Sequence, residues 1–199
     1  MAALLGRLRR EMNGAVVEAM EQAGIKGVLN YGVSIPTIRA IAKEVGKDYD
    51  FAKFLYVQQV RELRMAAINI AEPERVECED LNLWLGSKPT LELLDELALR
   101  LLSKCSKGVI EYIAREWLCG DDRLAIYTAL RVLTRANDVD FGELSLATKG
   151  ILSRFGDDID LARAVLSLYT MRLQGKALGE LPETRAAEFV QREYNALFG

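Results

Sequence analysis

Apolar residues recur every three or four positions along almost the whole chain, and this spacing limits the fold more than any other feature of the sequence. The run Ile35, Ile38, Ile41, Ala42 and Val45 is one example. Because an α-helix has about 3.6 residues per turn, such spacing places apolar side chains on one helical face. Alternation typical of strands has almost no support. The pattern therefore predicts an all-α protein.

Proline and capping residues divide this pattern into short helices. Proline is tolerated in the first turn of a helix, and Asp or Thr can cap the exposed backbone amides there. Pro36, Pro73, Pro89 and Pro182 all fall at or near expected helix starts. The sequence predicts helices over 2–23, 36–46, 50–57, 60–71, 73–85, 90–104, 108–118, 122–135, 141–154, 158–173 and 183–197.

The connections between these predicted helices are short, which forces successive helices to lie antiparallel. Helix pairs recur at a spacing of roughly 30 to 37 residues, which is typical of a helical repeat. A stack of such pairs curves into a solenoid whose concave groove suits an extended partner. A compact helical bundle without a groove is the alternative. In either case we expect a single domain over residues 1–199.

Composition excludes several classes of chemistry. The chain has no histidine, which removes Ser-His-Asp and Cys-His catalysis and HExxH metal sites. Its three cysteines, Cys78, Cys105 and Cys119, show no CxxC spacing and are interpreted as free thiols. We therefore expect no metal and no cofactor, and any catalysis must use carboxylates, lysine, tyrosine or water.

No segment approaches the roughly 20 uninterrupted apolar residues that a membrane span needs, and residues 1–10 are unlike a secretory signal. We expect a cytoplasmic protein without a membrane partner. The net charge of −3 argues mildly against nucleic acid, but the charge is uneven. Eight acids and two bases lie between Glu72 and Glu96, whereas seven bases and four acids lie between Arg100 and Arg135. Such a molecule can still present one basic face.

Three motifs in order resemble a known family. The first is a loop with a glycine followed by a proline-led helix, Asn30 to Glu44. The second is a Glu-x-Arg-x-x-Ala helix, Arg61 to Ala67, and the third is Arg115 to Leu118 with Gly120 to Asp122. Together they are similar to the DNA alkylation repair family of alkylpurine DNA glycosylases. The resemblance implies a HEAT-like α-solenoid whose basic concave face holds double-stranded DNA. It also implies an enzyme that removes positively charged N3- or N7-alkylated purines from that DNA.

The resemblance also implies a catalytic residue. The family carries an aspartate on a helix, four residues after a tryptophan, and the matching segment ends at Asp95. Leu91 stands where the aromatic residue is expected, and leucine cannot supply the cation–π attraction that holds a cationic base. The alternative reading of Asp95 is a solvated acid beside Glu92 and Glu96, on a helix that would repel phosphates.

In a DNA-binding groove of this family, lysine and arginine side chains from the second half of the chain would contact the DNA. Tyr127 or Thr128 falls near the position of the family's DNA-facing arginine. The alternative for these residues is an ordinary solvated helix face, and for Trp84 and Trp117 we expect core packing. The predicted DNA-binding residues are Arg115, Arg123, Tyr127, Arg131, Lys149 and Arg154.

Three functions remain open from the sequence. The first is a DNA glycosylase that uses Asp95. The second is a non-catalytic helical-repeat scaffold that binds DNA or a protein partner. The third is a small adaptor whose acidic and basic parts engage a protein. Fold alone does not choose among them, because function depends on the site rather than on the scaffold.

Overall fold

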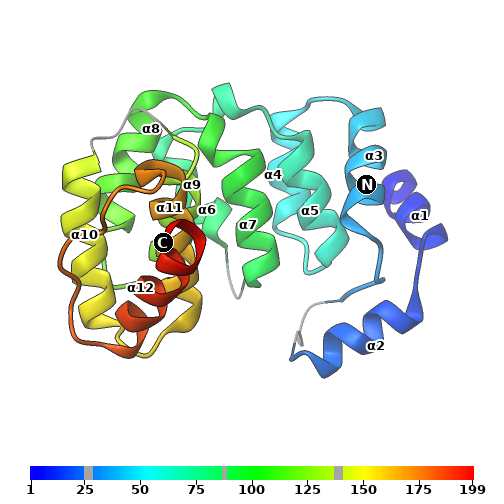
Figure 1. The fold of residues 1–199 in the computed structure, drawn as a ribbon. Helices are drawn as coiled ribbons and strands as arrows, with labels where there is room; N and C mark the ends of the chain where they lie inside the picture. The colour runs from blue at the N-terminus through cyan, green and yellow to red at the C-terminus, as the bar shows by residue number, and fades with distance from the viewer. Residues whose placement is uncertain (25–28, 87–88, 137–140) are drawn as a thin grey trace. The chain divides into compact units, whose positions relative to one another are not determined.

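The computed structural model describes residues 1–24, 29–86, 89–136 and 141–199, and this part of the chain is helical (Figure 1). Among these residues no β-strand forms, and the only extended pairing is an isolated bridge between Leu29 and Val60. The prediction of an all-α protein is therefore confirmed. None of the described helices has the length and apolar character that crossing a membrane requires.

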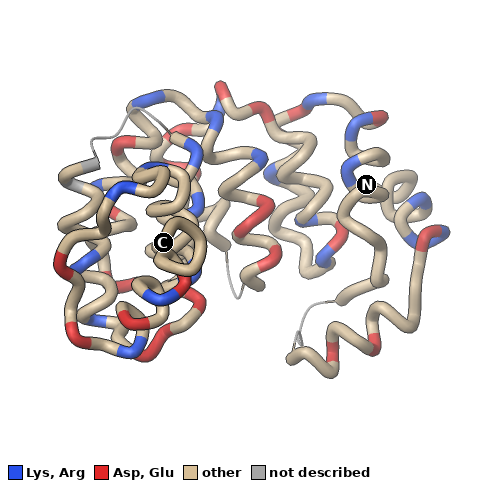
Figure 2. Tube along the Cα trace, in the orientation of Figure 1, with Lys and Arg blue, Asp and Glu red and all other residues tan. Residues whose placement is uncertain are grey.

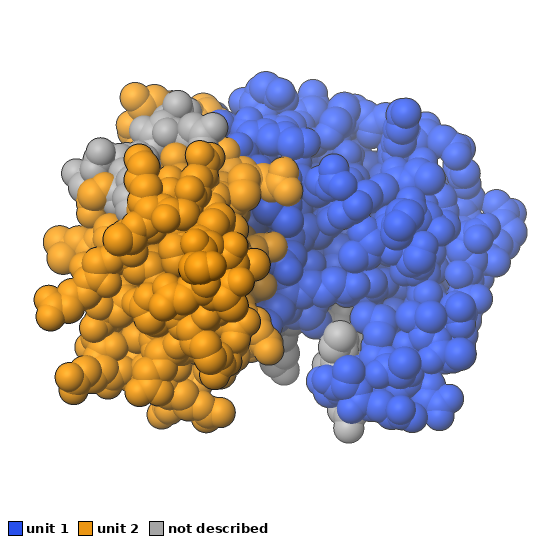
Figure 3. All heavy atoms as spheres, viewed as in Figure 1, with its two compact units in different colours: residues 1–105 blue, residues 106–199 orange. Residues whose placement is uncertain are grey.

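The chain forms two compact units, residues 1–105 and 106–199 (Figure 3). Helix α5 is the centre of the first unit, where it packs against α3, α4 and α7. Nine of its ten residues are buried, including the charged residues of the Glu-x-Arg motif. The first unit contains α1 (Ala2–Arg10), α2 (Gly14–Gln22), α3 (Ile35–Val45), α4 (Tyr49–Tyr56), α5 (Arg61–Ile70), η1 (Pro73–Arg75), η2 (Cys78–Asp80), α6 (Leu81–Leu85), α7 (Leu91–Arg100) and η3 (Leu102–Lys104).

Helix α11 has the same central place in the second unit, where it packs against α9, α10 and α12. Its buried face is formed by small and branched apolar residues such as Ala162, Val165 and Leu168. Tyr169 hydrogen-bonds through its hydroxyl to that of Thr148 on α10, 2.6 Å away. The second unit contains α8 (Lys107–Tyr112), the π-helical turn η4 (Ile113–Trp117), α9 (Arg123–Leu133), α10 (Phe141–Arg154), α11 (Ile159–Leu173) and α12 (Arg185–Phe198).

Capping residues set most helix starts where the sequence predicts them. The Thr90 hydroxyl accepts from the Leu93 amide, the Thr184 hydroxyl accepts from the Ala187 amide, and Asp122 and Asp158 cap α9 and α11 in the same way. Helix α4, however, is capped by Asp48 and not by Asp50. Each cap satisfies an amide that has no partner within its own helix.

The predicted helix over 2–23 is wrong in one respect, because it is two helices separated at Asn13. The side chain of Asn13 accepts from the Val16 amide and caps α2, and its own amide donates to the Tyr31 carbonyl. The predicted helix over 73–85 is likewise interrupted, forming the short turns η1 and η2 before α6. Local side-chain bonds of this kind compete with the helix and are not visible in hydrophobic periodicity.

A buried carboxylate ties the loop before α3 to α5. Glu62 is fully buried and accepts hydrogen bonds from the amides of Tyr31 at 3.2 Å and Val33 at 3.3 Å. The Arg61 guanidinium donates to the same carboxylate at 3.0 Å and to the Val33 carbonyl at 3.0 Å. Glu62 therefore fixes the glycine-containing loop that the first sequence motif predicts.

We predict that Glu62→Gln lowers the free energy of unfolding by about 3 kcal/mol, because it removes a buried charge that three donors share. Urea denaturation followed by circular dichroism measures this change. Glu188→Gln, at an exposed position of α12, is the control and should change stability by less than about 0.5 kcal/mol. Equal effects of the two substitutions would contradict the role given to Glu62.

Candidate nucleic-acid interface

The helix that carries the predicted catalytic residue begins where the sequence places it. Thr90 caps α7, Leu91 is its first residue, and Asp95 follows one turn later. Leu91 and Asp95 are both half-buried. The family has an aromatic residue at this position, and here it is the aliphatic Leu91. Leu91 lies one helical turn before Asp95, on the same side of α7.

The two glutamates beside Asp95 are neutralised by arginines from other helices. Arg61 of α5 holds Glu92 through two hydrogen bonds, Nε to Oε2 at 2.8 Å and Nη2 to Oε1 at 2.6 Å. Arg39 of α3 holds Glu96, with Nε donating to Oε1 at 2.9 Å. The guanidinium fork suits such two-point contacts. Helix α7 consequently carries less uncompensated negative charge than its sequence suggests.

Glu96 stays ionised despite its burial. Removal from water opposes the charged form, but hydrogen bonds from Arg39 and from the Asn69 amide outweigh this effect and hold the pKa of the carboxyl below its ordinary value. The pair therefore links α3, α5 and α7 most strongly while Glu96 is charged.

Both tryptophans of the chain belong to the core, as the sequence predicts. Trp84 packs against Tyr56 with ring centroids 4.8 Å apart, and its indole nitrogen donates to the Tyr49 hydroxyl at 3.3 Å. Trp117 is buried in the second unit. Neither ring offers an exposed face on which a nucleobase could stack.

Two of the predicted DNA-binding arginines are bound to acids within the second unit. Arg123 on α9 holds the α11 capping residue Asp158 and also Asp160, the latter at 3.1 Å. Arg154 at the end of α10 donates to Asp121 at 2.8 Å and to the Gly120 carbonyl at 3.1 Å. Both side chains therefore have structural contacts that spacing alone did not reveal.

The other four predicted DNA-binding residues differ in exposure. Tyr127 on α9 is only 7% exposed, and Arg131 and Lys149 are half-buried. Arg115, in η4, is exposed and forms no ion pair with the described residues. Asp95 lies in the first unit, whereas all six predicted DNA-binding residues lie in the second.

A group of bases lies near the C-terminal ends of α3 and α7, and we call it the basic edge. Lys47 donates to the carbonyls of Asn69 at 3.0 Å and Ala71 at 2.6 Å, where α5 ends. Burial, together with the neighbouring charge of Lys104, lowers the pKa of Lys47, and the nearby carboxylates of Glu74 and Glu72 oppose this effect. Figure 2 shows where bases and acids lie along the chain. The basic edge consists of Lys43, Lys47, Arg100 and Lys104.

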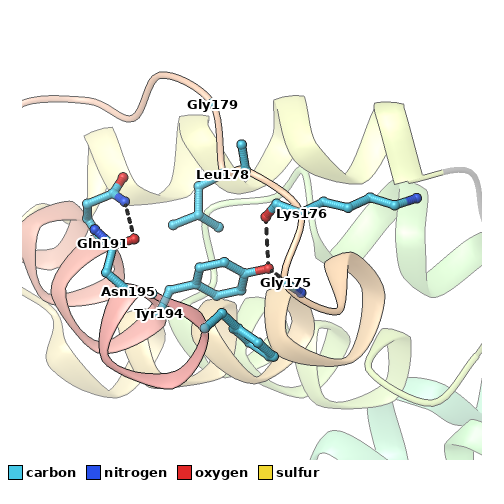
Figure 4. Close-up of a pocket in the computed structure, with 10 residues that line it drawn as sticks. Gly175, Lys176, Leu178, Gly179, Gln191, Tyr194 and Asn195 are labelled. Atoms are coloured by element: carbon cyan, nitrogen blue, oxygen red, sulfur yellow. Dashed lines mark hydrogen bonds between the residues drawn. The ribbon is translucent and has the colours of Figure 1, made fainter.

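A cavity of about 310 Å³ lies between α12 and the segment that follows α11 (Figure 4). The Tyr194 hydroxyl accepts from the Gly175 amide at 3.0 Å and donates to the Lys176 carbonyl at 2.9 Å. These bonds hold the segment against α12. Among the described residues that line this cavity there is no Asp or Glu side chain.

The three cysteines are free thiols that differ in burial. Cys105 is buried, and burial raises the pKa of its thiol to about 12, which keeps it protonated. Cys78 is partly buried and Cys119 is exposed. Across the described residues, no group of three or more acidic or cysteine side chains is arranged to hold a metal ion.

Comparison with known proteins identifies the family. A sequence profile for the DNA alkylation repair enzyme family matches residues 4–157, which is most of the chain. The chain belongs to this family. No curated protein matches it in sequence. The match to the family profile ends at residue 157, just before α11 begins. Helix α12 therefore lies outside the part of the chain that matches the family.

A solved structure gives the fold independently. It is described as "a new family of proteins related to the HEAT-like repeat DNA glycosylases with affinity for branched DNA structures". The two chains align with a TM-score of 0.73 over 99% of this chain and 94% of the other, with 15% sequence identity. At this identity the likeness establishes a shared fold. The predicted HEAT-like α-solenoid is therefore confirmed.

We predict that Glu96→Gln destabilises the protein in a pH-dependent manner. Because the folded pKa of Glu96 is lowered from 4.5, its contribution to stability is fully present above that pH. The contribution is lost as the pH falls through the folded pKa. The difference in unfolding free energy between the native protein and the variant should therefore be largest near pH 7 and shrink below pH 4.5.

Urea denaturation at a series of pH values measures this difference. Glu188→Gln serves as the exposed control and should show no comparable trend. A destabilisation by Glu96→Gln that is constant between pH 7 and pH 3 would show that packing, and not the charge on Glu96, accounts for its effect.

Proposed function

We propose that this member of the DNA alkylation repair family binds DNA through the sugar-phosphate backbone. The observation that carries the proposal is the neutralisation of α7. Arg39 and Arg61 each occupy one of the glutamates that flank Asp95, which reduces the repulsion that this helix would otherwise exert on phosphates. The basic edge and Arg115 supply exposed positive charge in the two units.

Branched DNA is the preferred substrate class in this proposal. The structural neighbour is described as having affinity for branched DNA structures, and this chain shares its fold. Backbone contacts distinguish DNA shapes by the positions of phosphates and do not require bases to stack on aromatic side chains. The burial of both tryptophans is compatible with that mode of recognition.

We predict salt-sensitive binding of the full chain to a four-way DNA junction, tighter than to a linear duplex of the same length. The logarithm of affinity should fall linearly with the logarithm of salt concentration, by about 0.9 for each phosphate contact in a duplex. Arg115→Gln should weaken binding and reduce this slope, because Arg115 is exposed and forms no ion pair with the described residues. Fluorescence anisotropy across a NaCl series provides both quantities.

Arg192→Gln is the matched control for Arg115→Gln. Arg192 is also exposed, but it pairs with Glu193 on α12, beyond the residues that the family profile matches. Binding that does not change with salt, or no binding to either DNA, would exclude the proposed function. An equal loss of DNA affinity in Arg115→Gln and Arg192→Gln would show that Arg115 does not contact the DNA.

A second function, alkylpurine glycosylase activity, is favoured by the position of Asp95. It is half-buried on α7, one turn after Leu91, at the position where the resemblance to the family implies the catalytic carboxylate. In this reaction the N-glycosidic bond breaks, the cationic base leaves with the bonding electrons, and water adds to the sugar carbon and loses a proton. A carboxylate stabilises the positive charge that develops on the sugar.

The glycosylase proposal predicts release of 7-methylguanine from alkylated duplex DNA by the native protein. Asp95→Asn should abolish release while leaving DNA affinity nearly unchanged. Chromatography of the released base measures the activity, and Glu188→Gln provides an exposed control. A native protein that binds DNA but releases no base above background would exclude this reaction for that lesion and leave the binding function in place.

A further inference from the structure

A buried arginine of the family motif has no counter-ion among the described residues. Arg64 on α5 is 3% exposed, and its Nε atom has no hydrogen-bond partner. No carboxylate of the described residues pairs with it. One face of its guanidinium lies over the Tyr56 ring, 4.8 Å from the centroid. The Tyr56 side chain also forms a hydrogen bond with Arg64, so the Nε–H group is the one left for another partner.

Arg61, three residues earlier on the same helix, shows how this protein normally satisfies a buried arginine. It is 7% exposed and donates to two carboxylates and to the Val33 carbonyl. A buried guanidinium that lacks a carboxylate partner is costly, because its charge has lost water and its N–H groups are only partly bonded. The contrast between Arg61 and Arg64 points to a ligand that supplies the negative charge missing at Arg64.

The space for such a ligand lies directly beside the guanidinium. A cavity of about 110 Å³ is lined by Arg64 together with Tyr56, Val57, Gln59, Leu83 and Gly86. Gly86 has a φ of +69°, and a Cβ atom there would lie 2.6 Å from the Arg64 Nη2 atom. Glycine therefore leaves room at the arginine that any other residue would fill.

The remaining lining groups agree with an anionic ligand. The Tyr56 hydroxyl donates to the Trp84 carbonyl at 2.6 Å, which fixes the ring that supports Arg64. Gln59 is exposed at the rim and its side-chain amide makes no hydrogen bond with the described residues. None of the described residues that line the cavity carries a carboxylate. A planar guanidinium and an amide donor together match the oxygens of a phosphate group.

We propose that the cavity at Arg64 binds an oxyanion, and that its natural occupant is a phosphodiester group of DNA. The site itself follows from the unpaired arginine and the adjoining space. The identification of DNA as the source of the phosphate rests on the proposed function. Val57 is exposed at the rim, so a phosphate on an extended backbone reaches the arginine from the open side of the cavity.

The first experiment uses inorganic phosphate and the full chain. Phosphate should raise the Tm of the native protein progressively, relative to NaCl at equal ionic strength, because a ligand that binds the folded state stabilises it. Arg64→Met should abolish this rise. Arg10→Met removes the same charge from an exposed position of the same unit and should leave the rise intact.

The second experiment distinguishes DNA from free phosphate as the source. If a DNA phosphate occupies the site, Arg64→Met should reduce the salt slope of junction binding by about 0.9, the contribution of one contact. Phosphate stabilisation that depends on Arg64, in a protein that does not bind DNA, would support the site while excluding the proposed function. DNA binding with an unchanged salt slope in Arg64→Met would exclude DNA as the occupant.

A purely structural arginine predicts a different pattern. In that case Arg64→Met would lower the Tm in phosphate-free buffer, and phosphate would act equally on the native protein and the variant. The proposal instead expects Arg64→Met to lose the phosphate-dependent rise in Tm, whatever the loss of the Tyr56 contact costs in phosphate-free buffer. A Tm rise with phosphate that is the same in both proteins would overturn the proposal.

Discussion

The buried carboxylate of Glu62 is the interaction on which the first unit depends. It gathers the loop amides of Tyr31 and Val33, and it orients Arg61, which extends to Glu92 on α7. The charged side chains of Glu62, Arg61 and Glu92 thus join the loop before α3, the central helix α5 and helix α7, which carries Asp95. Such a network is stable only when each member is satisfied, because a buried charge left alone is costly. The position of Asp95 therefore depends on residues that lie about thirty positions earlier.

Helix α5 places its two arginines in opposite electrostatic situations. Arg61 completes the network, and Arg64 lies against Tyr56 with no acid among the described residues to pair with it. Arg64 is the arginine of the Glu-x-Arg-x-x-Ala motif, and Arg61 directly precedes the glutamate of that motif. Packing separates them: one arginine organises the scaffold, and we propose that the other receives a phosphate. The same helix then carries a structural and a binding role within one turn.

The sequence predicts the fold well because its main signals are local. Apolar periodicity locates the helices, and Thr90 and Thr184 form the caps expected near their prolines. The break at Asn13 was missed, since it depends on a bond to the Tyr31 carbonyl, far along the chain. The candidate nucleic-acid interface is less predictable because it also depends on contacts between residues that are far apart in the sequence. The pairs Arg39 with Glu96 and Arg123 with Asp158 join residues separated by 57 and 35 positions, which no spacing rule reveals.

These long-range pairs change how the chemistry of the chain is interpreted. From sequence, α7 is an acidic helix that repels DNA, but in the folded protein two of its acids are bound to arginines. Conversely, Arg123 and Arg154 suggest a basic face, yet each binds an acid of its own unit. Net charge therefore says little about which surface attracts phosphate. What matters is which charges remain without an acid after folding. By that criterion we propose Arg64 and Arg115 as sites for DNA in preference to Arg123 and Arg154.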